Sequence, residues 1–189
     1  MKAKIFLIVL LLVTGASVKA QVSDKVTALS EAMKNIRSEK DDFTHITKYY
    51  SERTPKDQND FYDRFFLYIS SPENSEEPRL LLKVSHSSTI HPIKGYLSIK
   101  SIVLLSDDKT LTLPINLGTI SGNGTQHSSF TMGFGKRPIY FDFVKGMVSA
   151  QTTKARIITE NNKQVDFEIS SKERKAMSEV LALWDLMKK

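Results

Sequence analysis

The stretch that decides the fold is Tyr96-Leu-Ser-Ile-Lys-Ser-Ile-Val-Leu-Leu105, followed by Ser106-Asp-Asp-Lys109 and Thr110-Leu-Thr-Leu-Pro-Ile115. Apolar and polar residues alternate at the start of this stretch, which predicts a strand with one buried face. Ser and Asp favour turns because their side chains hydrogen-bond to the nearby backbone. The sequence therefore predicts an antiparallel hairpin. Pro114 cannot donate a ladder hydrogen bond, so the second strand ends there or lies at a sheet edge.

Short runs of aromatic and β-branched residues, separated by polar stretches, occur on both sides of this hairpin. Such runs are typical of β-strands. An Asn-rich turn joins the last two of these runs into a second hairpin. The sequence predicts strands at 43–50, 61–69, 79–86, 155–159 and 164–169, a loop at 118–129 and a short helical turn at 144–151. It also predicts a pair of strands on either side of a turn at 133–138, the second of which continues through 139–143.

Two segments show the spacing of an amphipathic helix. In residues 22–38 the apolar side chains recur at intervals of three and four, which predicts a helix that docks on the domain or serves as a partner-binding arm. Ser170 and Glu173 fit a capping box, in which each side chain accepts from the other's backbone N–H. Behind them lies a second apolar stripe, which we expect to rest on a sheet and to bury Trp184; it consists of Met177, Val180, Leu181, Trp184 and Met187.

These elements predict an α+β fold. It is mainly an antiparallel β sandwich or partly closed barrel, with an N-terminal helix and a C-terminal helix packed on it. Residues 21–189 are long enough to bury about two-thirds of their unfolded surface as one domain. We therefore expect a single β-rich domain with terminal helices.

Residues 1–20 have the layout of a secretory signal peptide: a cationic start, an apolar run over 5–14 and a tail of small residues. The apolar run is about half as long as a membrane span requires. We expect cleavage after Ala20 and no integral membrane segment in the mature chain. Cleavage would remove Lys2, Lys4 and Lys19 but no acidic residue, so the formal charge would fall from +6 to +3.

Composition excludes several kinds of chemistry. The chain has 189 residues, is 40% hydrophobic and 25% charged, and contains no cysteine. Disulfides, thiolate metal sites and cysteine nucleophiles are therefore impossible. A charge of +3 does not predict a nucleic-acid partner. An exported chain without cysteine fits a bacterial periplasmic or secreted protein, which does not rely on oxidation for its stability.

No motif predicts a catalytic residue, a metal site or a cofactor. Of the four histidines, His86 and His91 are five residues apart, which matches neither a helical zinc pair nor neighbours on one strand face. The chain lacks the Gly-x-Ser-x-Gly elbow of serine hydrolases. The paired acids, such as Asp107 and Asp108, lie in polar runs typical of solvated turns.

Aromatic residues supply the remaining candidates for binding. If 61–69 is a strand, Phe65, Leu67 and Ile69 face the core, and Tyr62, Phe66 and Tyr68 share the opposite face. Either a second layer covers that face, or it is an exposed platform for a sugar, peptide or protein. The candidate ligand-binding residues are Tyr62, Phe66, Tyr68, Asn123 and His127.

These observations favour a secreted or periplasmic, non-enzymatic binding protein with an unidentified protein, peptide or glycan partner. One alternative is a hydrolase of envelope polymers, with His86, His91 or His127 as the acid or base. Another is a structural subunit that self-associates.

Overall fold

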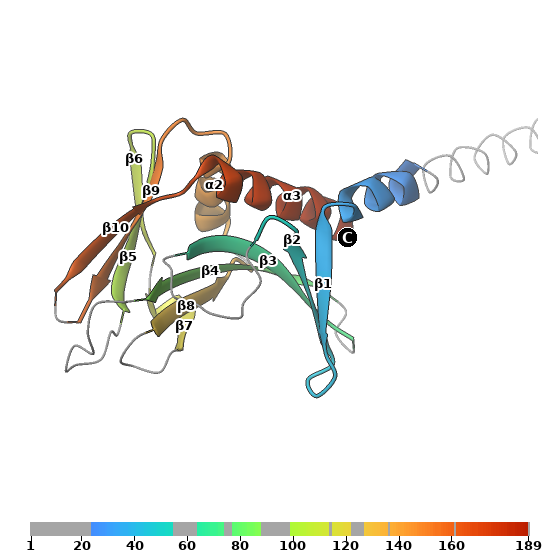
Figure 1. The fold of residues 1–189 in the computed structure, drawn as a ribbon, viewed down its shortest axis with the longest axis horizontal. Coiled ribbons are helices and arrows are strands. Elements are labelled where there is room, and N and C mark those ends of the chain that lie inside the picture. Colours follow the sequence, from blue (N-terminus) through green and yellow to red (C-terminus); the bar gives the residue numbers. More distant parts are fainter. Residues whose placement is uncertain are drawn as a thin grey trace, which may run out of the picture.

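The structure, a computed structural model, describes residues 24–54, 64–73, 77–87, 99–113, 115–121, 127–135, 137–160 and 162–188. In this part of the chain, two antiparallel sheets combine with helices near both ends (Figure 1). The prediction of a mainly antiparallel α+β fold is confirmed. The described strands of the two sheets do not pair with one another, so they form no closed barrel. The expected signal peptide lies outside the described residues.

The larger sheet has six strands in the order β1-β2-β3-β4-β8-β7, and the smaller has four in the order β10-β9-β5-β6. The larger contains β1 (Ile36–Asp41), β2 (Ile46–Ser51), β3 (Arg64–Pro72), β4 (Arg79–Ser87), β7 (Gly118–Ser121) and β8 (His127–Gly133). The smaller contains β5 (Ile99–Ser106), β6 (Lys109–Leu113), β9 (Thr153–Thr159) and β10 (Gln164–Glu168). Both predicted hairpins, β5–β6 and β9–β10, are present. A short 3-10 helix, η1 (Ile115–Leu117), precedes β7.

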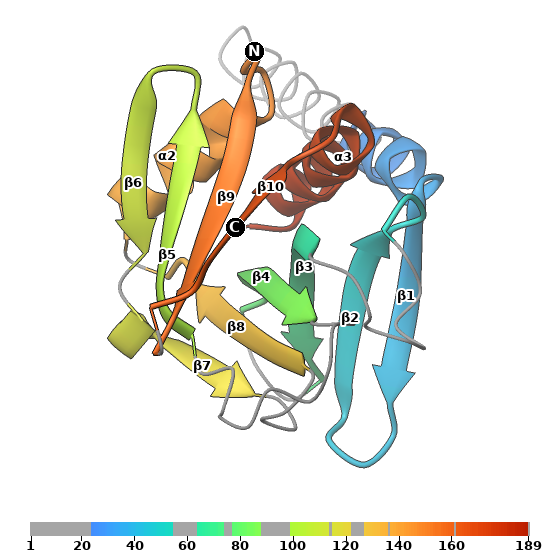
Figure 2. The same ribbon diagram turned by 60° about the vertical axis from the view of Figure 1, so that its left-hand side comes forward.

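Helices α2 (Pro138–Met147) and α3 (Ser171–Met187) complete the fold. Helix α3 packs against β2 and β3, whereas α2 packs against β5 and β6 (Figure 2). A single hydrophobic core joins both sheets and both helices. Its fully buried side chains include Phe65, Leu82, Ile102, Leu104, Phe130, Met147 and Val180.

The predicted capping box at the start of α3 is confirmed. The backbone N–H of Glu173 donates to Ser170 Oγ at 3.2 Å, and the backbone N–H of Ser170 donates to Glu173 Oε2 at 2.8 Å. Met177, Val180 and Leu181 are buried, as expected. Trp184 packs against the core but is only half-buried, because it also lines a pocket.

The expected helix over 22–38 is wrong in its second half. In the described residues the helix covers 24–33, and Ile36 begins β1, which pairs with β2 along its whole length. Ile36 fits the helical spacing, but pairing between β1 and β2 places it in the core, so tertiary contacts override the local pattern. Ala32 and Met33 pack against the core, whereas Val26 is 62% exposed.

Two further expectations are corrected. The predicted loop over 118–129 contains β7 and the start of β8, and Gly118 allows these strands to approach closely. A Cβ atom on Gly118 would lie 2.1 Å from Cε2 of Phe130. Residues 139–143, predicted as a strand, belong to α2. Pro138 at the start of this helix and buried Val144 and Met147 three residues apart explain the helical outcome.

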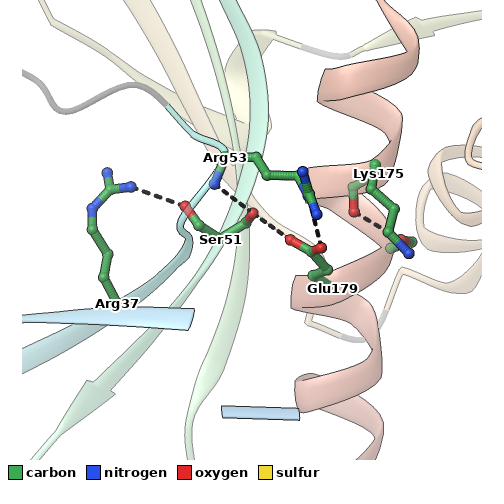
Figure 3. Close-up of polar contacts among 6 residues, drawn as sticks. Arg37, Ser51, Arg53, Lys175 and Glu179 are labelled. Carbon is green, nitrogen blue, oxygen red and sulfur yellow. Dashed lines mark hydrogen bonds and ion pairs between the residues drawn. The ribbon is translucent and has the colours of Figure 1, made fainter. Parts of the chain in front are cut away.

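A buried carboxylate ties α3 to the end of β2 (Figure 3). Ser51 Oγ donates to Glu179 Oε2 at 2.6 Å, and Arg53 Nε donates to Glu179 Oε1 at 2.9 Å. The Glu179 side chain is 8% exposed, whereas that of Arg53 is 45% exposed. On the other side of Ser51, Arg37 Nη1 donates to the Ser51 carbonyl at 2.9 Å. These bonds join β1, β2 and α3.

The turn between β1 and β2 holds one phenyl ring in solvent. Phe43 is 98% exposed, and Figure 1 shows this hairpin extending below the rest of the ribbon. Asp41 Oδ1 accepts from the backbone N–H of Phe43 at 3.0 Å and of Thr44 at 3.1 Å. The Glu73 backbone N–H donates to the His45 carbonyl at 2.9 Å, which ties the turn to the end of β3.

Replacing Glu179 with alanine should lower the free energy of unfolding by about 1–3 kcal/mol, because the buried Ser51 hydroxyl loses its acceptor. The Arg53 side chain is exposed enough to bond to water once Glu179 is removed. The loss of stability is therefore smaller than for a fully buried ion pair. Urea unfolding measures the change. The exposed Lys175→Ala on the same helix should change stability by less than about 0.5 kcal/mol. Equal losses in the two variants would contradict the role given to Glu179.

Replacing Asp41 with alanine should increase hydrogen exchange at the amides of Phe43 and Thr44, whereas Asp42→Ala should not. The backbone N–H groups of Thr44 and Phe43 hold the pKa of the Asp41 carboxyl below its usual value. The ionised group therefore stabilises the turn at neutral pH, and this contribution is lost as the pH falls through the lowered pKa. Amide exchange measured by NMR at several pH values tests this. If the Phe43 and Thr44 amides of the wild-type protein lose their protection from exchange already at a pH well above about 4, the pKa of Asp41 is not lowered.

Candidate functional site

A pocket opens where β4 begins, β8 ends, and α2 and the C-terminal end of α3 meet. Its volume is about 1180 Å³. The ends of these elements bring together residues that are far apart in sequence. The aromatic and charged residues that line it are Glu77, Arg79, Phe134, Arg137, Phe141, Trp184 and Lys188.

Three aromatic residues line the apolar side of the pocket; Phe141 and Trp184 are half-buried and have accessible side-chain surface, whereas Phe134 is buried behind them. Phe134 is 3% exposed, and its backbone N–H donates to the Leu80 carbonyl at 3.3 Å. The ring of Phe141 meets that of Phe134 edge to face, with centroids 5.8 Å apart. Trp184 comes from α3 and is half-buried. Because Phe134 is held by the core, this wall is largely formed before any ligand binds.

Three cationic side chains line the same pocket: Arg79, Arg137 and Lys188. Arg137 immediately precedes α2, and its Nη1 donates to the Gly133 carbonyl at 3.0 Å, which fixes the guanidinium near the end of β8. Gly135 has a φ of +48°, a left-handed conformation that favours glycine and turns the chain from β8 towards α2. Arg79 and Lys188 are exposed, and Lys188 Nζ lies 2.5 Å from Asp185 Oδ1.

This arrangement is suited to binding a ligand that is both acidic and apolar. Arginine guanidinium groups form paired hydrogen bonds with carboxylate or phosphate oxygens. Aromatic side chains provide contact area for a ring or an apolar chain. Glu77, the acidic lining residue, is exposed and would disfavour a second negative charge close to it.

The structure places two of the sequence-predicted ligand-binding residues side by side. Phe66 and Tyr68 lie on the face of β3 opposite the core, as predicted, and their ring centroids are 6.2 Å apart. The ring of Tyr50, from β2, stacks on Tyr68 at 5.3 Å. Phe66 is only 6% exposed and Tyr68 is half-buried, so Phe66 offers almost no accessible surface. Ligand binding on this face stays a prediction.

The other predicted residues are not brought to this cluster by anything described. Tyr62 and Asn123 lie outside the described residues. His127 begins β8, where the strand register pairs it with Ser87 of β4; its side chain is not among the described parts of the chain.

The histidines do not define a site within the described residues. His45 Nδ1 lies 3.5 Å from Glu73 Oε2 at the β1–β2 turn, and both side chains are exposed. His86 lies in β4, and His91 is outside the described residues. Among the residues that the structure describes, no group of three His, Asp or Glu side chains could hold a metal ion. The same residues include no helix long and apolar enough to cross a bilayer.

Sequence reasoning missed the pocket because its residues come from four separate elements. Trp184 was expected to be buried, and Arg137 was expected to lie in a turn between strands. A local signal does exist: Gly135-Lys-Arg-Pro138 places two cations between Phe134 and the aromatic residues of α2. Nothing in the sequence, however, brings Arg79 to that position.

No protein-family model, curated protein or solved structure matches this chain.

Proposed function

We propose that this protein is an exported, non-enzymatic binding protein, and that the pocket beside Trp184 takes an acidic ligand with an apolar body. The observation that carries this proposal is that two partly exposed aromatic side chains, Phe141 and Trp184, line the same pocket as three cations, Arg79, Arg137 and Lys188. Pockets of several hundred cubic ångströms with apolar walls and a few convergent polar groups are typical of ligand sites.

The lining favours binding over catalysis. The described residues that line the pocket include no Ser, Thr or His, and their one carboxylate, that of Glu77, is exposed to solvent with no hydroxyl nucleophile among the lining residues. Arginine and lysine side chains carry several hydrogen-bond donors and no acceptor, so they are suited to binding and orienting anions. The signal-like segment at residues 1–20 supports a location in the periplasm or outside the cell.

The only tryptophan of the chain, Trp184, lines the pocket and therefore reports on its occupancy. We expect anilinonaphthalene sulfonate, an aromatic anion, to quench Trp184 fluorescence in a saturable manner. Its uncharged analogue N-phenylnaphthylamine should bind more weakly, because it cannot interact with the cations. Replacing Arg79 and Lys188 together with serine should raise the dissociation constant of the anion about fivefold.

The matched control is Lys109→Ser, which removes an exposed cation from β6 in the other sheet. This variant should bind both dyes like the wild-type protein. The proposal fails if the anionic dye leaves Trp184 fluorescence unchanged, or if the control weakens binding as much as the pocket variant does.

A further inference from the structure

The β1–β2 turn exposes a phenyl ring that does not pack against the rest of the chain. Phe43 is 98% exposed, although removing a phenyl ring from water is worth roughly 1.5–3 kcal/mol. The turn around it is ordered by the two hydrogen bonds from Phe43 and Thr44 to Asp41. Asp42, next to Phe43, is also exposed. The turn thus displays an aromatic ring beside a carboxylate on a defined backbone.

The pocket has the complementary character. Its wall is aromatic and its charged lining is mainly cationic, so it matches a phenyl group with a neighbouring carboxylate. Beside the lining residue Pro138, Ile139 leaves 69% of its surface in solvent. A small ligand inside the pocket would not cover this rim, whereas a protein segment would.

The register of the larger sheet places both features at the same end of the sheet. Ile46 of β2 pairs with Pro72 of β3, Ser70 of β3 pairs with Arg79 of β4, and Leu81 of β4 pairs with Gly133 of β8. The turn and the pocket are separated by two to three strand spacings, about 10–14 Å along the sheet. Because the turn is tied to β3 through Glu73 and His45, Phe43 does not reach the pocket of its own chain.

We propose that two copies of this chain associate by inserting Phe43 of each copy into the pocket of the other. The segment that would occupy the pocket is the β1–β2 turn, which has an exposed phenyl ring and an adjacent exposed carboxylate. This inference rests on the proposed function, because it requires the pocket to be a binding site. Turn and pocket share one end of the sheet, so a single twofold axis lets both contacts form at once.

The association should be weak and readily reversible, since it uses two small contacts instead of one large apolar face. It would leave the described core unchanged, because Phe43, Asp42 and Arg79 are all exposed in the single chain. Substitutions at these positions therefore test the contact without disturbing the fold.

Sedimentation velocity of the mature chain, over concentrations up to the millimolar range, should show a dimer. Phe43→Ser should raise the dimer dissociation constant at least about tenfold. Asp42→Lys and Arg79→Glu should each weaken the dimer, and the double variant should recover much of the loss because opposite charges again meet. Val26→Ser removes another exposed apolar side chain and should have no effect. Excess anilinonaphthalene sulfonate should dissociate the dimer by occupying the pocket.

A monomer at every concentration overturns the inference, and so does a dimer that Phe43→Ser leaves intact or that the charge reversal does not restore. Dye binding by the dilute wild-type monomer separates the two proposals. If the dye quenches Trp184 but no dimer forms, only self-association fails. If a Phe43-dependent dimer forms but the dye neither binds nor competes, Phe43 inserts elsewhere, and both the pocket function and this inference are wrong.

Discussion

The packing of α3 across β2 and β3 is the constraint on which the rest of the structure depends. The larger sheet is strongly curved, and its inner face is covered partly by the smaller sheet and partly by this helix (Figure 2). Val180 and Met177 contribute apolar area without any exposed surface. Apolar contacts alone leave the position of a helix along a sheet loosely defined, whereas the bonds of Glu179 to Ser51 and Arg53 are directional. They hold the helix to the end of β2 at Glu179, between one and two turns before Trp184.

Local sequence patterns correctly predicted the elements that pair with the next element along the chain. The β5–β6 and β9–β10 hairpins follow from alternation and turn residues, and the start of α3 follows from Ser170 and Glu173. The errors arise where a distant contact outweighs local preference. Ile36 joins a strand because β2 pairs with it, although it also fits a helical spacing.

The candidate site shows the same division. The sequence correctly placed Phe66 and Tyr68 together on one strand face, since alternation along a single strand decides that. Their exposure depends on what covers the face, which no local pattern records. The pocket could not be predicted, because Arg79 and Trp184 are brought together only after β4 has paired with β8 and α3 has docked. The sequence shows that these residues exist, but only the arrangement of the strands and helices brings them close together.

Helix α3 contributes to both the core and the pocket. Val180 is in the core, whereas Trp184, about one turn further along, and Lys188, directly after the helix, line the pocket. Occupancy of the pocket is therefore thermodynamically linked to folding. A ligand that binds only the native state adds about 2.7 kcal/mol of stability at a concentration one hundred times its dissociation constant. A compound that occupies the pocket would raise the melting temperature of the protein accordingly, so thermal denaturation detects such a compound without any assay of activity.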